Sequence, residues 1–144
     1  KVTAVESYTE IGENEVSQKA GGVFYMIYLL VENKDLPNGY IISPDVKLID
    51  GLGRIYYPDL KAKFYVKNLF DWEKNLLPGK TYSGVLVFDV PSDAKGFKLE
   101  IRNDWKEVEK VYITIPNGFV VFMGISESVV KAREENKLLN ASIN

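Results

Sequence analysis

The chain has 144 residues, of which 46% are hydrophobic and 26% charged, a composition typical of one folded domain that excludes a disordered protein. Its 18 basic and 20 acidic side chains give a net charge of -2, which excludes a general attraction to nucleic acid or to anionic lipid. There is no Cys and no His, so disulfides, thiolate zinc sites and the commonest general base are absent. We therefore expect a protein that is not an enzyme and has no cofactor.

The first third of the chain predicts strands that lead into a long apolar segment. Val2–Tyr8 alternates loosely between apolar and polar side chains, which is typical of a strand. A turn is expected at residues 12–14, and Gly21-Gly22 is expected to end a short polar strand. In Val23–Asn33 both faces of an extended chain are apolar, so this segment should lie at the centre of a sheet.

The middle of the chain predicts a turn, a hairpin and an irregular insertion. Leu36–Gly39 is a turn sequence, and a short strand is expected at Tyr40–Ser43. Residues 46–57 (VKLIDGLGRIYY) predict a hairpin in which Asp50 accepts backbone hydrogen bonds across the turn. Pro58–Trp72 fits neither the strand nor the helix period, and we expect a short helix or an irregular excursion there.

Three further strands are predicted before residue 116. Pro78-Gly79 predicts a type II turn with a positive φ at Gly79, followed by a strand over Thr81–Val90 in which Gly84 marks a bulge or the close approach of another backbone. Residues 97–102 predict a strand with one wet face, and Val108–Ile115 the next strand. Many short strands with Gly and Pro between them, and no βαβ alternation, indicate an all-β sandwich or barrel.

Residues 119–144 are interpreted as a C-terminal extension of a domain that spans residues 1–118. A helix is expected from about residue 126, with Ser126 as its N-cap. Its apolar stripe comprises Ile125, Val129, Ala132 and Leu139. The helix either covers an edge or end of the sandwich, or docks on a partner or on a second copy of the chain.

Three segments, in this order, resemble a known family. They are VFYMIYLLVENKDLPNGY, VKLIDGLGRIYYPD and LLPGKTYSGVLVFDVPSDAKGFKLEI. Together they resemble the small immunoglobulin-like domains of bacterial and archaeal surface lipoproteins that are catalogued as a domain of unknown function. The similarity covers roughly Val23–Ile115. It implies an immunoglobulin-like antiparallel β-sandwich on the outer side of the membrane, and it transfers no activity because the family has no defined catalytic residues.

Exposed aromatic side chains often mark binding surfaces, and this chain offers several. The candidate residues for such a surface are Tyr56, Tyr57, Tyr65, Trp72 and Trp105. The alternative is that these rings belong to the core of the sandwich. Asn140-Ala141-Ser142 also fits the acceptor pattern for N-glycosylation.

Carboxylates offer the chain a possible hard-cation site, with Asp45, Asp50 and Asp59 as the nearest cluster along the sequence. Their spacing matches no calcium loop, so we interpret them as solvated loop acids and predict no metal.

The sequence favours an extracytoplasmic module, at the cell surface or secreted, that binds or structures the cell envelope without catalysis. Its partner would be an unknown protein or envelope component, with no nucleic acid, and with membrane attachment only through an anchor absent from this chain. The alternative hypothesis is a cytoplasmic sandwich that resembles proteinase inhibitors and acts through a loop.

Overall fold

The computed structural model describes residues 1–13, 16–32, 46–71, 77–102 and 110–143. Its strands are β1 (Val2–Glu13), β2 (Val16–Glu32), β3 (Val46–Ile49), β4 (Ile55–Tyr56), β5 (Thr81–Val90), β6 (Lys98–Arg102), β7 (Lys110–Thr114) and β8 (Val120–Ile125). Two short 3₁₀ helices, η2 (Leu60–Phe64) and η3 (Asn117–Phe119), and the C-terminal helix α1 (Glu127–Ile143) complete the described elements.

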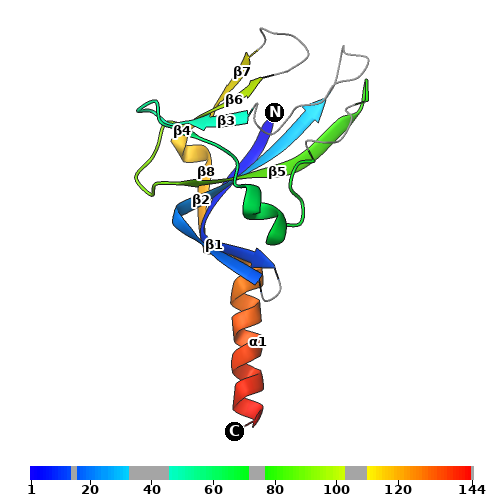
Figure 1. The fold of residues 1–144 in the computed structure, drawn as a ribbon, viewed down its shortest axis with the longest axis vertical. Helices are drawn as coiled ribbons and strands as arrows, with labels where there is room; N and C mark the ends of the chain where they lie inside the picture. Colours follow the sequence, from blue (N-terminus) through cyan, green and yellow to red (C-terminus); the bar gives the residue numbers. More distant parts are fainter. Residues whose placement is uncertain (14–15, 33–45, 72–76, 103–109, 144) are drawn as a thin grey trace.

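The strands form two facing sheets, and the predicted β-sandwich is confirmed (Figure 1). The first sheet has the strand order β5-β2-β1-β8, and the second has the order β4-β3-β6-β7. The strand pairs are antiparallel, as expected, with the exception of β1 and β8, which run parallel. Strands from the two ends of the chain are therefore neighbours in one sheet.

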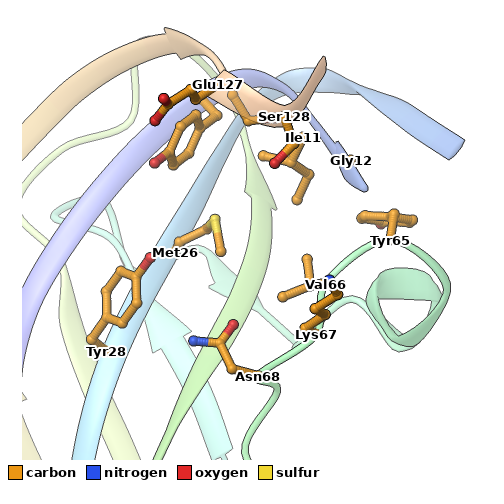
Figure 2. A pocket seen from close by; sticks show the side chains of 12 residues that line it. Ile11, Gly12, Met26, Tyr28, Tyr65, Val66, Lys67, Asn68, Glu127 and Ser128 are labelled. Carbon is orange, nitrogen blue, oxygen red and sulfur yellow. The ribbon is translucent and has the colours of Figure 1, made fainter. Parts of the chain in front are cut away.

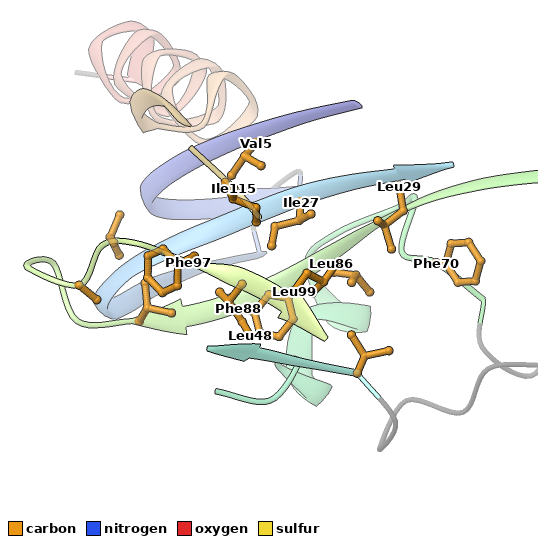
Figure 3. Close-up of a cluster of buried hydrophobic side chains, with 14 residues drawn as sticks. Val5, Ile27, Leu29, Leu48, Phe70, Leu86, Phe88, Phe97, Leu99 and Ile115 are labelled. Atoms are coloured by element: carbon orange, nitrogen blue, oxygen red, sulfur yellow. The ribbon is translucent and has the colours of Figure 1, made fainter. Parts of the chain in front are cut away.

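The core between the sheets is built from alternate side chains of the strands, those that point to the inner face of each sheet (Figure 3). Ile27 and Leu29 of β2 are buried there, and Leu48 of β3 and Leu99 of β6 face them from the second sheet. The fully buried rings of Phe88 and other aromatics fill the same layer. The burial of such a ring is worth roughly 1.5–3 kcal/mol, so this layer is the main source of stability.

β2 is central, as its double apolar face predicted, because it pairs with β1 on one side and β5 on the other. Phe24 and Met26 point to the outer face of the first sheet, where they join a second buried cluster. The predicted break at Gly21-Gly22 is wrong, since β2 continues through both residues. Their amides donate to the carboxylate of Asp89 on β5, which keeps the chain extended there.

The predicted turn at residues 12–14 is also misplaced. Gly12 lies within β1 and pairs with Ser17, so the strand extends beyond the predicted end at Tyr8 to Glu13. A register shift between Tyr8 and Glu10 bends β1 at this point and directs its last residues away from the sandwich (Figure 1).

The segment after β4 covers the outer edge of β5. Residues 60–64 form the expected short helix, η2, and Ala62 and Tyr65 pack onto the outer face of the first sheet. The amide of Phe70 then donates to the carbonyl of Val85 on β5 at 3.0 Å, and the amide of Val85 donates to the carbonyl of Asn68 at 2.9 Å. We call residues 59–70 the strap.

Gly84 is the position where the strap comes closest to β5. A Cβ atom at this position would collide with Cα, Cβ and N of Phe70. The predicted close approach of another backbone at Gly84 is therefore confirmed, and its physical reason is the strap.

Two other predicted turns, in the β3–β4 hairpin and at Pro78-Gly79, have the expected form. β3 and β4 pair antiparallel, with Leu48 opposite Tyr56, as the hairpin prediction required. Gly79 has a φ of 75°, and the amide of Lys80 donates to the carbonyl of Leu77 at 3.3 Å, which is a type II arrangement. The turn and strand predicted over residues 36–43 lie outside the described residues.

The boundary predicted at residue 118 falls directly before β8. This strand hydrogen-bonds to β1, so residues 120–125 belong to the first sheet. α1 follows from Glu127 and extends away from both sheets (Figure 1). Val129 is buried against the sandwich, whereas every residue from Arg133 to Ala141 is exposed.

Candidate functional site

The five predicted aromatic residues do not form one surface in the described part of the chain. Tyr56 is half-buried and Tyr65 is only 4% exposed, whereas Tyr57 is 59% exposed. Trp72 and Trp105 lie outside the described residues. Tyr65 is a core residue, because its ring packs against Phe24 and its hydroxyl donates to Asp59 at 2.6 Å.

Tyr56 belongs to a network centred on Asp50, whose side chain is 1% exposed. The carboxylate accepts four hydrogen bonds, from the amides of Leu52 and Arg54, the Arg54 Nε and the Tyr56 hydroxyl, at 2.6–2.9 Å. Burial favours the neutral acid, but these hydrogen bonds outweigh it and lower the pKa of Asp50 to about 2. The predicted backbone-accepting role of Asp50 is confirmed, and the network closes the β3–β4 hairpin.

Asp59 has a comparable local task. One of its oxygens accepts from the amide of Lys61 at the start of η2, and the other accepts from the Tyr65 hydroxyl. Asp45 lies outside the described residues. Within the described ranges no three acidic, His or Cys side chains come together as a metal-binding group.

A pocket of about 260 Å³ opens on the outer face of the first sheet, and we call it the outer pocket (Figure 2). Residues from β1, β2, the strap and the start of α1 surround it. They are Tyr8, Ile11, Gly12, Met26, Tyr28, Tyr65, Val66, Lys67, Asn68, Ser126, Glu127 and Ser128. Its volume is close to the lower end of the range for small-molecule sites, which begins at about 300 Å³.

The sheet itself supplies the apolar floor and two phenols of the outer pocket. Met26 and Tyr28 are alternate residues of β2, so their side chains point to the same face, and Tyr8 lies opposite Phe24 on the neighbouring strand β1. Met26 is 8% exposed, whereas both tyrosines are half-buried. Polar hydroxyls thus surround a small apolar base.

The two phenols share one carboxylate. The Tyr8 hydroxyl donates to Glu6 at 3.2 Å. Burial, together with the charge and hydrogen bond of Glu6, raises the pKa of Tyr8 to about 12, and the same causes raise the pKa of Tyr28. Both hydroxyls are therefore neutral near pH 7, when they can donate and accept hydrogen bonds but cannot act as general bases.

The start of α1 is held beside the outer pocket by Glu10 of β1. Its carbonyl accepts from the Ser126 amide at 2.9 Å, and its carboxylate accepts from Arg133 at 2.5 Å and from Ser17 at 3.0 Å. The hydrogen bond from Arg133 lowers the pKa of Glu10 against the effect of burial. This anchorage fixes the position of the hydroxyls of Ser126 and Ser128.

Ser126 was predicted as the N-cap of α1, and its carbonyl does accept from the amides of Val129 and Val130. Its hydroxyl oxygen is buried and makes no hydrogen bond within the described residues, so it does not cap the helix through its side chain. A buried hydroxyl without a partner is unfavourable.

A second depression, of about 340 Å³, lies on the same face at the other side of η2. Two of the predicted aromatic residues, Tyr57 and Tyr65, line it together with Gln18, Phe24, Asp59, Lys61 and Asp89. Asp59 and Asp89 already accept hydrogen bonds from the strap and from β2. The outer pocket is the stronger candidate because a smaller share of its lining is charged and Met26 gives it an apolar base.

Sequence reasoning missed the outer pocket although part of its signal was present. Tyr8, Met26 and Tyr28 were assigned to strands, and their shared face could be read from strand parity. Asn68 and Ser126 come from distant segments, and only the fold brings them to the same place. Asn140, the predicted glycosylation acceptor, lies far along α1 and is exposed.

No helix in the described ranges combines the length and apolar character required to cross a membrane.

Comparison with known proteins gives two matches. The profile of the family described as a domain of unknown function, DUF4352, matches residues 1–110, where residues 23–115 had been expected from the sequence. A solved structure of similar fold is that of the presumed lipoprotein YcdA from Bacillus subtilis, with 14% identity and a TM-score of 0.50. The match covers 94% of this chain and 46% of that protein, so the chain spans about half the length of this relative. No curated protein sequence matches the chain.

Proposed function

The chain belongs to the DUF4352 family of domains of unknown function, and from this premise we propose that it is a non-catalytic binding module on the outer side of the cell membrane. The sugar of an envelope glycan is the ligand that we propose for its outer pocket. The lipoprotein assignment of the structural relative and the family resemblance support the location. One observation carries the binding role, namely the pocket lined by neutral phenols and hydroxyls around an apolar base.

The chemistry of the outer pocket favours a sugar. A pyranose ring has one apolar face and a rim of hydroxyls, and protein sites for such ligands combine apolar or aromatic surfaces with a few polar groups. Met26 offers the apolar surface, while Tyr28, Asn68 and Ser128 offer donors and acceptors. The raised pKa of Tyr28 keeps its hydroxyl neutral, which suits binding without proton transfer.

Ligand binding can be tested by titration of the purified protein with N-acetylglucosamine oligomers, followed by intrinsic fluorescence and thermal shift. We expect weak binding, and Tyr28→Phe should weaken it about fivefold because one hydrogen bond is lost. Tyr57→Phe removes an exposed hydroxyl outside the outer pocket and serves as the matched control, with affinity within about twofold of wild type. Equal effects of the two variants, or no saturable binding at millimolar sugar, would contradict the proposal.

The location can be tested separately by fractionation of native cells and intact-mass measurement. We expect recovery with the membrane or secreted fraction, with additional mass from a lipidated N-terminus or from a glycan on Asn140. Cytosolic recovery of an unmodified protein would contradict an extracytoplasmic role. The proteinase-inhibitor alternative would then be tested against a panel of proteases.

A further inference from the structure

The four sheet edges of the sandwich differ in how they are protected. The edge of β5 is covered by hydrogen bonds from the strap. β4 has two residues, and β7 carries Lys110, which pairs with Glu100 at 3.6 Å. Short, charged or covered edge strands are the usual ways to prevent pairing with another chain.

β8 is neither very short nor charged, although it has a bulge at Gly124. It lies at the edge of the first sheet, with no strand beyond it among the described residues, and its sequence VVFMGI contains no charge and no proline. Five large apolar side chains in and next to this strand are 40–67% exposed, and we call them the β8 patch: Phe119, Val121, Phe122, Met123 and Ile125.

We propose that the β8 patch is the interface of a two-fold symmetric homodimer, in which β8 pairs antiparallel with β8 of a second copy. The two first sheets then continue into each other. Each copy pairs its β8 edge with the β8 edge of the other, which leaves no free β8 edge, so the assembly closes at two copies.

The second copy fits the β8 patch better than a strand from a foreign partner. The patch has no charge that would select a complementary charge, and its apolar side chains match themselves without like-charge repulsion. Residues on both sides of the strand are exposed, as a sheet continued in its own plane requires. The patch also lies after residue 110, outside the residues that the family profile matches.

The geometry of β8 limits the length of the pairing. The register with β1 shifts between Phe122 and Gly124, and Gly124 has a φ of 76°, so the strand is bulged there. We therefore place the two-fold axis next to Phe122, the most exposed residue of the patch. Ile125, beyond the bulge, contributes only its side chain.

The area of the β8 patch sets the expected affinity. With roughly 150–200 Å² for each large apolar side chain, the exposed fractions give on the order of 450 Å² per copy. Two copies then bury at most about 1,000 Å² with the strand backbones, the lower limit for a specific interface. We expect a dissociation constant in the range of about 10–100 μM.

The helix was the surface expected for self-association from the sequence, and it fits less well. Val129 is 3% exposed and packs on the sandwich. The exposed Val130 and Leu138 are separated on their face of α1 by the charged residues 133, 134 and 137, so they form no continuous apolar patch. Leu138→Glu is therefore a useful comparison with a change in the β8 patch.

The test is sedimentation velocity of the chain from about 5 to 500 μM. We expect a concentration-dependent dimer that Phe122→Glu weakens by about tenfold or more. Leu52→Glu, at a residue 82% exposed on the β3–β4 turn, and Leu138→Glu should leave the dimer unchanged. A monomer at every concentration would overturn the proposal, as would a dimer that is lost in Leu138→Glu and kept in Phe122→Glu.

Disulfide cross-linking is a second test, and it does not require the fold to tolerate the charge that Phe122→Glu introduces. The chain has no cysteine, so Phe122→Cys introduces a unique thiol next to the proposed axis. Mild oxidation should convert the dimer to a disulfide-linked form, because Cα atoms of facing residues in antiparallel strands lie about 4.5–5.5 Å apart. Cross-linking no faster than in Leu52→Cys would contradict the antiparallel β8 pairing.

Discussion

The side chain of Asp50 provides the hydrogen-bond acceptors that hold the β3–β4 turn together. Its two oxygens accept four hydrogen bonds from Leu52, Arg54 and Tyr56. The carboxylate is buried, so its charge is stabilised by these donors rather than by water. The lowered pKa of Asp50 therefore makes the stability of the hairpin depend on pH.

The pH dependence can be predicted with its sign. The folded pKa of about 2 is lower than the ordinary value of 3.8, so the charge of Asp50 stabilises the fold above about pH 4. This contribution is lost as the pH falls from about 4 to about 2. Asp50→Asn should lower the Tm at pH 7 by roughly 5–10 °C, because an amide has one acceptor oxygen for four donors.

Thermal melts of both proteins between pH 7 and pH 2 check this prediction. The difference between wild type and Asp50→Asn should shrink at the acidic end. Glu134→Gln, at an exposed position on α1, is the control and should follow wild type. A constant difference over the whole range would show that the charge of Asp50 is not what stabilises the turn.

Gly84 allows a prediction about packing. A methyl group there would overlap the backbone of Phe70, so Gly84→Ala should displace the strap and cost about 1–3 kcal/mol. Gly118→Ala is the matched control, because nothing lies within 4 Å of its Cβ position. Urea denaturation of both variants checks the prediction, and similar midpoints would mean that the strap does not rest on β5 at this residue.

At the scale of elements, α1 is joined to the sandwich by the buried Val129 and by polar contacts with Glu10. Glu10 is 4% exposed, and Arg133 reaches it from the second turn of the helix. Because the guanidinium is itself half exposed, the pair is worth less than a fully buried one. The pair matters because the loss of Arg133 would leave the buried carboxylate of Glu10 without its cationic partner.

Arg133→Ala should destabilise the protein by about 1–2 kcal/mol, through the loss of a charged hydrogen bond to a buried carboxylate. The start of α1 borders the outer pocket, so the same change should increase hydrogen exchange of the amides at residues 126–130. Lys131→Ala, at an exposed residue two positions away, should do neither. Unchanged exchange in Arg133→Ala would mean that the Ser126 amide alone holds the helix.

The sequence predicted most strands because strand periodicity and turn residues are local signals. β5 has the predicted ends, and β2 has the predicted central place. β8 was missed because residues 120–125 lack alternation and were assigned to the extension. These residues form a strand because they pair with β1, and a local sequence pattern does not indicate that distant pairing.

The candidate site was less predictable than the fold for the same reason. Asp50 could be assigned from its neighbours along the chain, since its donors lie within six residues. The outer pocket joins Tyr8, Asn68 and Ser126, which meet only in the folded chain. Tyr65 was a candidate for a binding surface, with the core as the alternative, because the sequence does not show that the strap folds back over the sheet.

At the scale of the whole molecule, a two-layer body carries a projecting helix. At 1.5 Å per residue the 17 residues of α1 extend about 25 Å. Only the first turns touch β1, and residues 134–141 are exposed. The distal half of the helix therefore contributes little to the stability of the sandwich.

Two truncations test this division. Removal of residues 134–144 should change the Tm by no more than about 2 °C, because no buried side chain is lost from the described part. Removal of residues 127–144 should lower it by roughly 5 °C or more, since Val129 and the partner of Glu10 are lost. Equal melting temperatures for the two truncated chains would contradict the assigned role of the first turns.

The parallel pairing of β1 with β8 has a consequence for the order in which the chain can fold. Val5 pairs with Val120, so the outer side of β1 stays open until β8, more than a hundred residues later in the chain, has been synthesised. Contacts between such distant residues slow folding, which we expect to take milliseconds to seconds. During synthesis the nascent chain thus remains without a complete first sheet for longer than a protein of local contacts would.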